Sequence, residues 1–298
     1  MRDTTPSRTA QWVAAARGLG RLLARDVRIA DDPYGLVFSS PYIARMIDGD
    51  PGRSAQALGR IPGLATWIVY MQVRTRLIDD AVRAFAAAGG RQVVVLGAGY
   101  DCRALRLPEI AGAGLYEIDH PATQGHKLAV LARLGVATPA RTLAWDFEAR
   151  PMDELPGALA ALGHDRRAPT FTIWEGVTMY LTECAIDASL RAVVAWSGPG
   201  SEIAINYVSK SRLARPALVA RVLLAMARQV GEPYKFGWEP AALPTYLAAR
   251  GFEVMRDIST TDAARTLMPP QLAARHARAN SHIAFARVIS GATRGDQG

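Results

Sequence analysis

The stretch VVVLGAGYD at residues 93–101 decides the fold of this chain. Its four apolar residues form the kind of run that is typical of a strand covered on both faces, and Gly-x-Gly follows at once. Glycine permits a positive φ and lets the backbone approach a ligand without a side-chain clash. The stretch therefore predicts a parallel strand with a ligand-binding turn at its carboxyl end.

Strand-like segments recur after this point and alternate with helical ones. The expected strands are residues 92–96, 114–118, 140–144, 169–174, 201–207, 252–257 and 281–289. Helical patterns such as 121–134, 183–197 and 240–250 separate the first six. This alternation predicts an α/β fold built on a doubly wound, largely parallel sheet.

The residues before the sheet follow a different pattern. Apolar residues recur there at helical spacing, no strand-like alternation appears, and a second helix is predicted to start near Thr66. We therefore expect a helical N-terminal cap at residues 1–90 and a ligand-binding domain at residues 91–290. Residues 208–238 form an insertion after the fifth strand, which is placed to act as a lid over the cleft.

Composition excludes several classes of protein. The chain has 298 residues, of which 50% are hydrophobic, and no apolar run has the length of a membrane span. The N-terminus does not resemble a secretion signal, so we expect a cytoplasmic protein that does not enter a membrane. No feature of the sequence indicates an oligomeric state.

The net charge of +8 does not indicate nucleic-acid binding, because no basic run occurs. The two cysteines, Cys102 and Cys184, are isolated, and the five histidines have no metal-ligand spacing. We therefore expect neither a nucleic-acid partner nor a metal site.

Acidic residues follow three successive strand candidates. Asp119 ends the second strand, Asp146 and Phe147 follow the third, and Glu175 follows the fourth. Because the carboxyl ends of parallel strands lie at one edge of the sheet, these side chains are expected to surround one cleft. An acid at the position of Asp119 can accept hydrogen bonds from both hydroxyls of a ribose. The structural alternatives are a helix N-cap for Asp119 and a simple turn for Asp146 and Phe147.

The glycine turn lacks the full dinucleotide-binding fingerprint. A third glycine would be required at position 102, which is Cys102, and Asp101 puts a carboxylate where a diphosphate would lie. A carboxylate repels phosphate and attracts a sulfonium or ammonium group. Gly97 and Gly99 with their acidic neighbours therefore favour S-adenosylmethionine as the ligand over a nicotinamide dinucleotide.

Four motifs occur in an order that resembles a known family. They are VRTRLIDD at residues 73–80, LGAGYDCR at 96–103, YEIDHP at 116–121 and WEGVTMYL at 174–181. The family is that of the leucine carboxyl methyltransferases, which depend on S-adenosylmethionine and whose bacterial branch includes polyketide O-methyltransferases. The resemblance implies a Rossmann-like, seven-stranded class I methyltransferase sheet whose last strand is antiparallel.

The resemblance also implies a role for each residue of the site. For the donor, it implies that Arg74 holds the methionine carboxylate, Gly97 lies under the methionine portion, Asp119 binds the ribose, Asp146 and Phe147 contact the adenine, and Glu175 lies beside the methionine end. For the acceptor, it implies that Arg74 and Tyr180 contact a carboxylate. The structural alternative for Arg74 is an ion pair with Asp79 or Asp80 on its own helix.

Methyl transfer from a sulfonium is an in-line displacement, so the protein has to align two reactants and needs no covalent nucleophile. A carboxylate acceptor is already ionised at neutral pH, whereas a phenol or alcohol needs a base, for which His120 and His126 are the nearest histidines in the sequence. The structural alternative for His120 is a solvated or helix-capping residue. We predict an S-adenosylmethionine-dependent O-methyltransferase that esterifies a carboxylate of a small metabolite. A nicotinamide-dependent oxidoreductase and a non-catalytic module that binds an S-adenosyl ligand are the alternatives.

Overall fold

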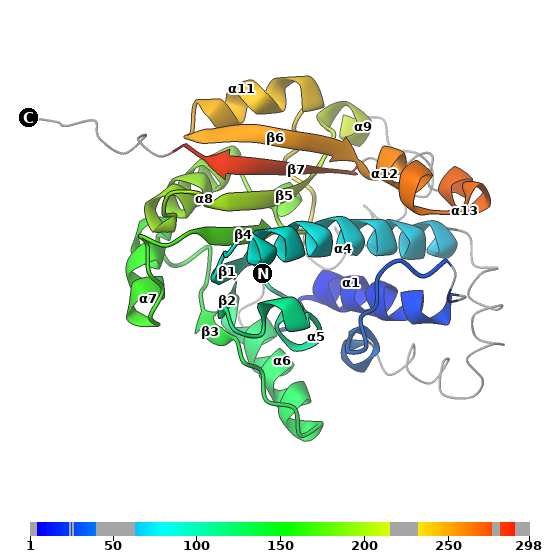
Figure 1. The fold of residues 1–298 in the computed structure, drawn as a ribbon, viewed down its shortest axis with the longest axis horizontal. Coiled ribbons are helices and arrows are strands. Elements are labelled where there is room, and N and C mark those ends of the chain that lie inside the picture. The colour runs from blue at the N-terminus through cyan, green and yellow to red at the C-terminus, as the bar shows by residue number, and fades with distance from the viewer. Residues whose placement is uncertain are drawn as a thin grey trace, which may run out of the picture.

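A computed structural model describes residues 5–23, 25, 27–39, 63–214, 232–275 and 281–289. Its centre is a seven-stranded sheet with the strand order β3-β2-β1-β4-β5-β7-β6 (Figure 1). The strands are β1 (Gln92–Leu96), β2 (Gly114–Asp119), β3 (Arg141–Ala144), β4 (Thr170–Trp174), β5 (Glu202–Val208), β6 (Phe252–Ser259) and β7 (Ser281–Val288).

The predicted fold class and strands are confirmed. Each strand begins and ends within two residues of its predicted bounds. Strands β1 to β5 pair in parallel, whereas β7 lies antiparallel between β5 and β6. The chain runs from β1 outward to β3 and then returns to β4 on the other side of β1. The strand order therefore reverses beside β1, which is where open parallel sheets bind ligands.

The helices occupy both sides of this sheet. They are α1 (Arg8–Leu19), α4 (Leu64–Ala87), α5 (Arg103–Arg106), α6 (Pro121–Arg133), α7 (Leu155–Ala161), α8 (Glu183–Trp196), α9 (Lys210–Ala214), α11 (Leu243–Ala248), α12 (Thr260–Leu267) and α13 (Pro270–Arg275). Short 3₁₀ turns are η1 (Gly20–Leu22), η2 (Gly35–Phe38), η3 (Pro108–Ile110), η4 (Met152–Glu154), η5 (Thr178–Tyr180) and η6 (Pro240–Ala242).

Strand β1 shows why its sequence is a continuous apolar run. Val94 and Leu96 belong to the hydrophobic core that α7, α8 and α11 share with the sheet. Val93 and Val95 belong to the core on the other face, with α4, α12 and α13. From Val93 to Leu96, both faces of the strand are therefore buried against apolar side chains.

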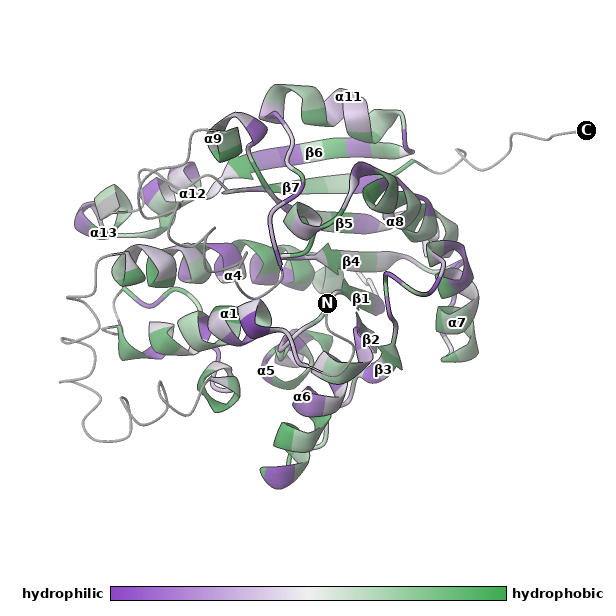
Figure 2. Cartoon of the chain, turned by 180° about the vertical axis from the view of Figure 1, so that it is seen from behind, coloured by the Kyte–Doolittle hydropathy of each residue, from purple (hydrophilic) through white to green (hydrophobic). Residues whose placement is uncertain are grey.

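Helix α4 packs directly on the sheet. Its buried residues include Val69, Val73 and Leu77, which recur every four positions and lie in one core with β1 and β4. Figure 2 shows the matching pattern, in which hydrophobic segments recur along α4 between hydrophilic ones.

The predicted division into a cap and a binding domain stays a prediction. Residues 40–62 of the cap and 215–231 of the lid lie outside the described residues.

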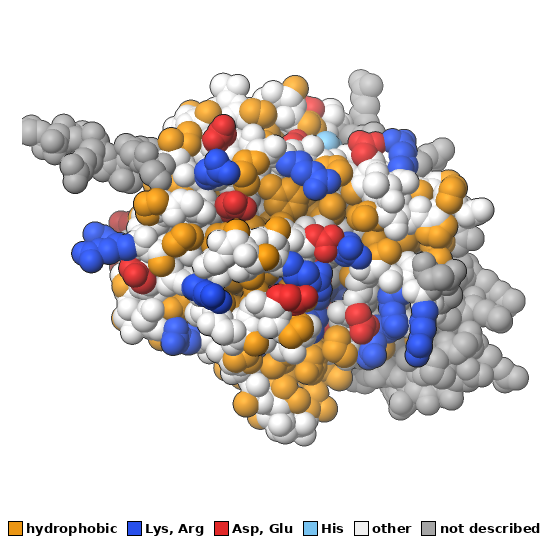
Figure 3. All heavy atoms as spheres, viewed as in Figure 1, with side chains coloured by type: hydrophobic (Ala, Val, Ile, Leu, Met, Phe, Trp, Pro, Cys, Tyr) orange, Lys and Arg blue, Asp and Glu red, His pale blue; other side chains and the backbone are white. Residues whose placement is uncertain are grey.

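The surface carries mixed charges. On the face shown in Figure 3, Lys and Arg side chains are interspersed with Asp and Glu. Within the described residues, no helix combines the length and the hydropathy needed to cross a membrane. Helix α4, with 24 residues, carries several charged side chains.

We expect Leu190→Ala in α8 to lower the free energy of unfolding by about 2–5 kcal/mol, because the side chain is fully buried in the core. Leu134→Ala is the matched control. Leu134 is 50% exposed, so its loss should change the free energy by less than about 0.5 kcal/mol. Urea denaturation followed by tryptophan fluorescence measures both, and equal losses would contradict the packing of α8.

Candidate active site

A cavity of about 230 Å³ lies at the carboxyl ends of β1, β2, β3 and β4. The residues that follow these strands line it, together with residues of α1 and of the segment 232–235. It brings together all eight residues that the sequence predicted for the site: Arg74, Gly97, Gly99, Asp119, Asp146, Phe147, Glu175 and Tyr180. Their individual roles in binding stay predictions.

The glycine turn after β1 closes tightly against its neighbours. Gly97 and Gly99 have φ values of 72° and 52°, in the region that side chains disfavour. The amide of Gly97 donates to the carbonyl of Ile118 at 2.9 Å, which ties the turn to the end of β2. A Cβ atom on Gly97 would lie 2.4 Å from Cγ2 of Val177, so the loop after β4 also excludes a side chain there.

Asp119 lies at the end of β2 and faces the glycine turn. Its carboxylate accepts hydrogen bonds from the amides of Gly99 and His120, the latter at 2.7 Å. The N-cap of α6 is His120, whose Nδ1 accepts from the amide of Ala122 at 3.3 Å. The N-cap interpretation of Asp119 is therefore wrong. For His120 the capping interpretation is confirmed, whereas the solvated one is wrong because the side chain is buried.

Burial dominates the electrostatics of Asp119. Loss of solvent raises the pKa of this carboxyl group to about 6, although the amides of Gly99 and His120 act in the opposite direction. The ionised carboxylate is thus less favourable here than in water, and a ligand that donates hydrogen bonds to it would offset part of this cost.

Asp146 forms a turn and also lines the cavity. Its Oδ1 accepts from the amides of Glu148 and Ala149 at 2.9 and 3.2 Å, which confirms the turn interpretation. Its Oδ2 lies 3.8 Å from Nε2 of His120. Phe147 lines the cavity beside it. The turn places Asp146 and Phe147 at the β3 side of the site.

Arg74 and Glu175 form a buried ion pair across the cavity wall. Nε of Arg74 lies 2.6 Å from Oε1 of Glu175, and both side chains are less than 10% exposed. Nη1 of Arg74 donates to the hydroxyl of Tyr70 at 3.2 Å. Burial alone would raise the pKa of Glu175, but Arg103 and Arg74 outweigh it and hold the pKa far below its usual range.

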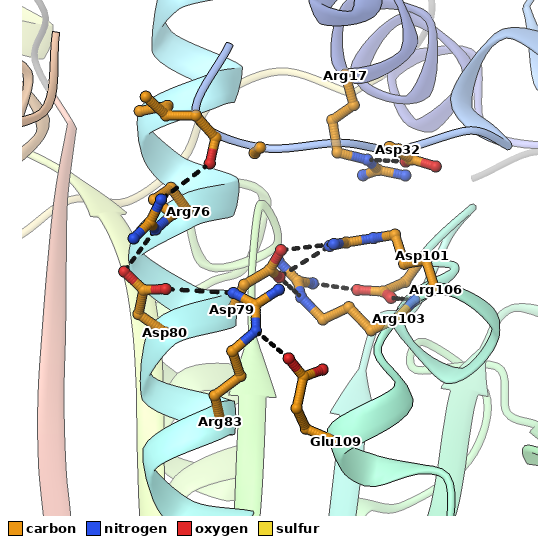
Figure 4. Close-up of polar contacts among 12 residues, drawn as sticks. Arg17, Asp32, Arg76, Asp79, Asp80, Arg83, Asp101, Arg103, Arg106 and Glu109 are labelled. Atoms are coloured by element: carbon orange, nitrogen blue, oxygen red, sulfur yellow. Dashed lines mark hydrogen bonds and ion pairs between the residues drawn. The ribbon is translucent and has the colours of Figure 1, made fainter. Parts of the chain in front are cut away.

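The expected alternative for Arg74, a pair with an acid of its own helix, is wrong. Both candidate acids, Asp79 and Asp80, are bound to other arginines (Figure 4). Asp79 binds Arg103 and Arg106, and Asp80 binds Arg76 and Arg83. The partner of Arg74 is instead 101 positions away in the sequence.

The cavity is not purely acidic, which corrects the premise that its acids alone select a cation. Arg17 and Lys235 line it beside Arg74. Sequence reasoning missed Arg17, which lies on α1 and donates from Nη2 to the carbonyl of Tyr100 at 2.5 Å. Nε of Arg17 binds Asp32 at 2.8 Å. No local pattern marks Arg17, because its role depends on α1 lying over the glycine turn.

Tyr180 lies in η5, beyond Glu175 and on the β4 side of the cavity. Its ring packs edge-on against Tyr234, with 5.2 Å between the ring centres. Nearby, the hydroxyl of Thr9 donates to the carboxylate of Glu232, and the amide of Lys235 donates to the carbonyl of Met179 at 2.7 Å. Sequence reasoning also missed Glu232 and Lys235, which come from the predicted lid.

Asp119 and Asp146 follow β2 and β3, whereas Glu175 and Tyr180 follow β4 on the other side of β1. The cavity therefore has a β2–β3 end and a β4 end.

His126, which the sequence suggested as a base, does not line the cavity. Its Nδ1 lies 2.8 Å from the hydroxyl of Tyr100. The described residues contain no group of three or more His, Cys, Asp and Glu side chains that could hold a metal ion.

Comparison with known proteins assigns the chain to a family. The model of the leucine carboxyl methyltransferase family matches residues 10–194, which is more than half of the chain. The chain belongs to this family. The resemblance predicted from the four motifs is thereby confirmed.

Relatives with a described activity point the same way. The chain is 37% identical over 214 residues to an inferred S-adenosyl-L-methionine-dependent methyltransferase of Mycobacterium sp. (strain JLS), a match that covers 67% of this chain and 66% of that protein. A relative from Mycolicibacterium vanbaalenii with the same description is 32% identical over 261 residues, which is 83% of this chain and 82% of that protein. The chain thus spans just under two thirds of the first relatives that it matches. Their activity and methyl donor are those that the sequence motifs predicted.

Two solved structures share the fold. An inferred methyltransferase from Thermobifida fusca YX aligns over 96% of both chains with a TM-score of 0.59 and 16% identity. A DUF574 family protein from Streptomyces avermitilis MA-4680 aligns over 92% of this chain and 97% of that chain, with a TM-score of 0.58 and 17% identity. Both likenesses support the predicted α/β fold.

We expect the difference in stability between the wild type and Asp119→Asn to depend on pH, because only the wild type can release a proton at this position. Because burial raises the pKa of Asp119 to about 6 from its ordinary 3.8, the unfolded chain releases this proton at a lower pH than the folded protein. The stability of the wild type relative to the variant should therefore fall as the pH rises from about 4 to about 6, by roughly 3 kcal/mol at most. Urea unfolding at four pH values between 4 and 7 measures the difference. A difference that does not vary with pH would contradict the raised pKa.

Proposed function

We propose that this protein transfers a methyl group from S-adenosylmethionine to an oxygen of a small metabolite, with a carboxylate as the acceptor. One observation carries the proposal: residues that follow four strands line a single cavity at the point where the strand order reverses. The family assignment supports the same reaction class.

The residues of the cavity fit the parts of the donor. Asp119 would bind the ribose, and Asp146 and Phe147 would contact the adenine at the β2–β3 end. Arg74 and Glu175 offer the opposite charges that the carboxylate and ammonium of the methionine portion require. When bound, S-adenosylmethionine supplies an electrophilic methyl group on its sulfonium. Residues that bind the nucleoside at the β2–β3 end would leave this group facing the β4 end.

The β4 end would then hold the acceptor. Burial raises the pKa of Tyr180 well above its usual value, so its hydroxyl stays protonated and can donate a hydrogen bond to an acceptor oxygen. Lys235 adds a positive charge to the same end of the cavity. Arg74 lines the same cavity and is paired with Glu175, which follows β4. A carboxylate would accept these bonds and would need no base.

A hydroxyl acceptor is the second candidate, and Glu232 is the observation that favours it. This carboxylate lines the cavity near Tyr180 and could take the proton of a phenol or alcohol. His120, which the sequence suggested as a base, caps α6 at the β2–β3 end and is directed to the donor side. The choice between the two acceptor classes therefore depends on Glu232.

An oxidoreductase and a non-catalytic binding module have less support than a methyltransferase. An oxidoreductase would place a diphosphate at the glycine turn, where the carboxylate of Asp119 lines the cavity and already accepts a hydrogen bond from the amide of Gly99. A non-catalytic module would bind the donor without forming a methylated product. A titration with NADH tests for the oxidoreductase, and an assay for transferred methyl groups tests for the non-catalytic module.

We expect S-adenosylhomocysteine to bind with a dissociation constant of about 1 to 100 μM. Asp119→Ala should weaken the binding by at least about tenfold, because two hydrogen bonds to the ribose are lost. Isothermal titration calorimetry measures both affinities. Asp153→Ala, at an exposed carboxylate of η4, is the matched control and should bind like the wild type. Equal affinity in the Asp119 variant would refute the assignment of the site.

We expect a product of radioactive methyl transfer to release methanol in mild alkali, as a methyl ester does and a methyl ether does not. With a carboxylate acceptor, kcat should stay nearly constant from pH 7 to pH 9, above the pKa of Asp119, and should change little in Glu232→Gln. If the acceptor is a hydroxyl, the same variant should lose about a hundredfold in kcat. Glu253→Gln on the exposed part of β6 controls for the loss of a carboxylate.

A further inference from the structure

A buried cluster of charged side chains lies behind the β4 end of the cavity. We call it the buried ion cluster, and it consists of Arg74, Asp79, Asp101, Arg103, Arg106 and Glu175. Every member has a side-chain exposure between 2% and 7%. Figure 4 shows how Arg103 and Arg106 converge on Asp79 while Arg103 also reaches Asp101. The three cations balance the three anions.

Arg103 is the member that joins separate parts of the fold. Its Nε donates to Oδ1 of Asp79 on α4 at 2.7 Å, and its Nη1 donates to Oε2 of Glu175 at 2.8 Å. Its Nη1 also binds the carboxylate of Asp101, whose Oδ1 accepts from the backbone amide of Arg103 at 2.7 Å. The guanidinium is therefore fixed from α4, from the turn after β1 and from the loop after β4.

The two oxygens of Glu175 have different arginine partners. Oε1 is bound by Arg74, which lines the cavity, and Oε2 is bound by Arg103, which does not. Under the proposed function, the methionine carboxylate of the donor competes with Glu175 for Arg74. Arg103 has no access to the ligand, so its bond to Glu175 persists when the donor binds.

We propose that Arg103 is a positioning residue for the methyl donor, because it keeps Glu175 ionised and aimed at the donor's ammonium while Arg74 binds the donor's carboxylate. The inference rests on the proposed function and adds to it a residue outside the cavity. Asp79 and Asp101 serve as the anchors of Arg103. Lysine cannot replace it fully, because an ammonium is a point charge without the planar fork that spans several carboxylates.

The other charges around Glu175 determine what the loss of Arg103 would do. The cations that face Glu175 are Arg103 from α5, Arg74 from α4 and Arg17 from α1, and the facing anion is Asp101. Asp79 would keep two bonds from Arg106, at 2.5 and 2.8 Å. Asp101 would lose its direct cation partner and would repel Glu175 more strongly. Without Arg103, Glu175 therefore takes up a proton at a higher pH.

The test measures binding of S-adenosylhomocysteine by calorimetry from pH 5.5 to pH 8. We expect Arg103→Met to weaken the binding by about tenfold at pH 8, and by a larger factor relative to the wild type as the pH falls, because a protonated Glu175 no longer attracts the ammonium. Asp119 also titrates in this pH range, in the variant and in the wild type alike. Dividing the dissociation constant of the variant by that of the wild type at each pH removes this shared contribution. Arg83→Met is the matched control, since Arg83 forms a partly exposed pair with Glu109.

Two further variants separate positioning from general structural support. Arg103→Lys keeps the charge, so it should bind more weakly than the wild type by a factor that does not vary with pH. In a Glu175→Gln background, Arg103→Met should cause little further loss, because Arg103 acts through Glu175. Circular dichroism shows whether Arg103→Met folds. If it does not, Arg103→Lys replaces it in the pH series and in the double variant. Arg103→Lys should then cause little further loss of affinity in the Glu175→Gln background.

The possible outcomes distinguish this inference from the proposed function. Wild-type affinity in Arg103→Met at every pH would overturn the inference and leave the donor site intact. If Arg103→Met weakens binding in the Glu175→Gln background as much as it does in the wild type, the inference is also overturned, since that result shows a structural role. Failure of the wild type to bind S-adenosylhomocysteine would overturn the proposed function and this inference together.

Discussion

A parallel sheet that is covered on both faces leaves the ends of its strands as the place for polar chemistry. In β1, Val93 and Val95 enter one core while Val94 and Leu96 enter the other. Polar side chains therefore emerge where the strands stop, and the strand order reverses beside β1, which is where an open parallel sheet leaves a crevice for a ligand. The cavity, the glycine turn and the acids at the strand ends all follow from this constraint.

Burial of charge is the second determinant of the site. Charges taken out of water need partners, and the buried ion cluster meets this need with equal numbers of arginines and acids. Among the described residues, Asp119 forms no ion pair: burial raises its pKa, and the backbone amides of Gly99 and His120 together with the charge of Lys127 offset only part of the effect. The β4 end of the cavity is therefore electrostatically satisfied without a ligand, whereas the ribose position would gain from hydrogen-bond donors. Ion pairs would thus support the site at the β4 end, and the buried carboxylate of Asp119 would favour a ligand with hydrogen-bond donors at the ribose position.

The strands, the glycine turn and the acids at the strand ends were predictable because each depends on local chemistry. Apolar runs, glycine where φ is positive and carboxylates after strands are visible within a few residues of each other. The contacts of Arg74 were not predictable in this way, since two acids of its own helix were nearer in sequence than Glu175. Asp79 was unavailable because Arg103 and Arg106 already neutralise it, a competition that no local pattern reveals.

The sequence by itself determined the order of the strands along the chain, the turn at Gly97 and the family motifs, because backbone preference and side-chain periodicity act over short distances. The tertiary structure decided which charges meet. It paired Arg74 with Glu175, placed Arg17 over the glycine turn and brought Glu232 and Lys235 to the β4 end. These pairings depend on how the helices pack on the sheet and on the balance of all buried charges at once, and both are properties of the folded chain as a whole.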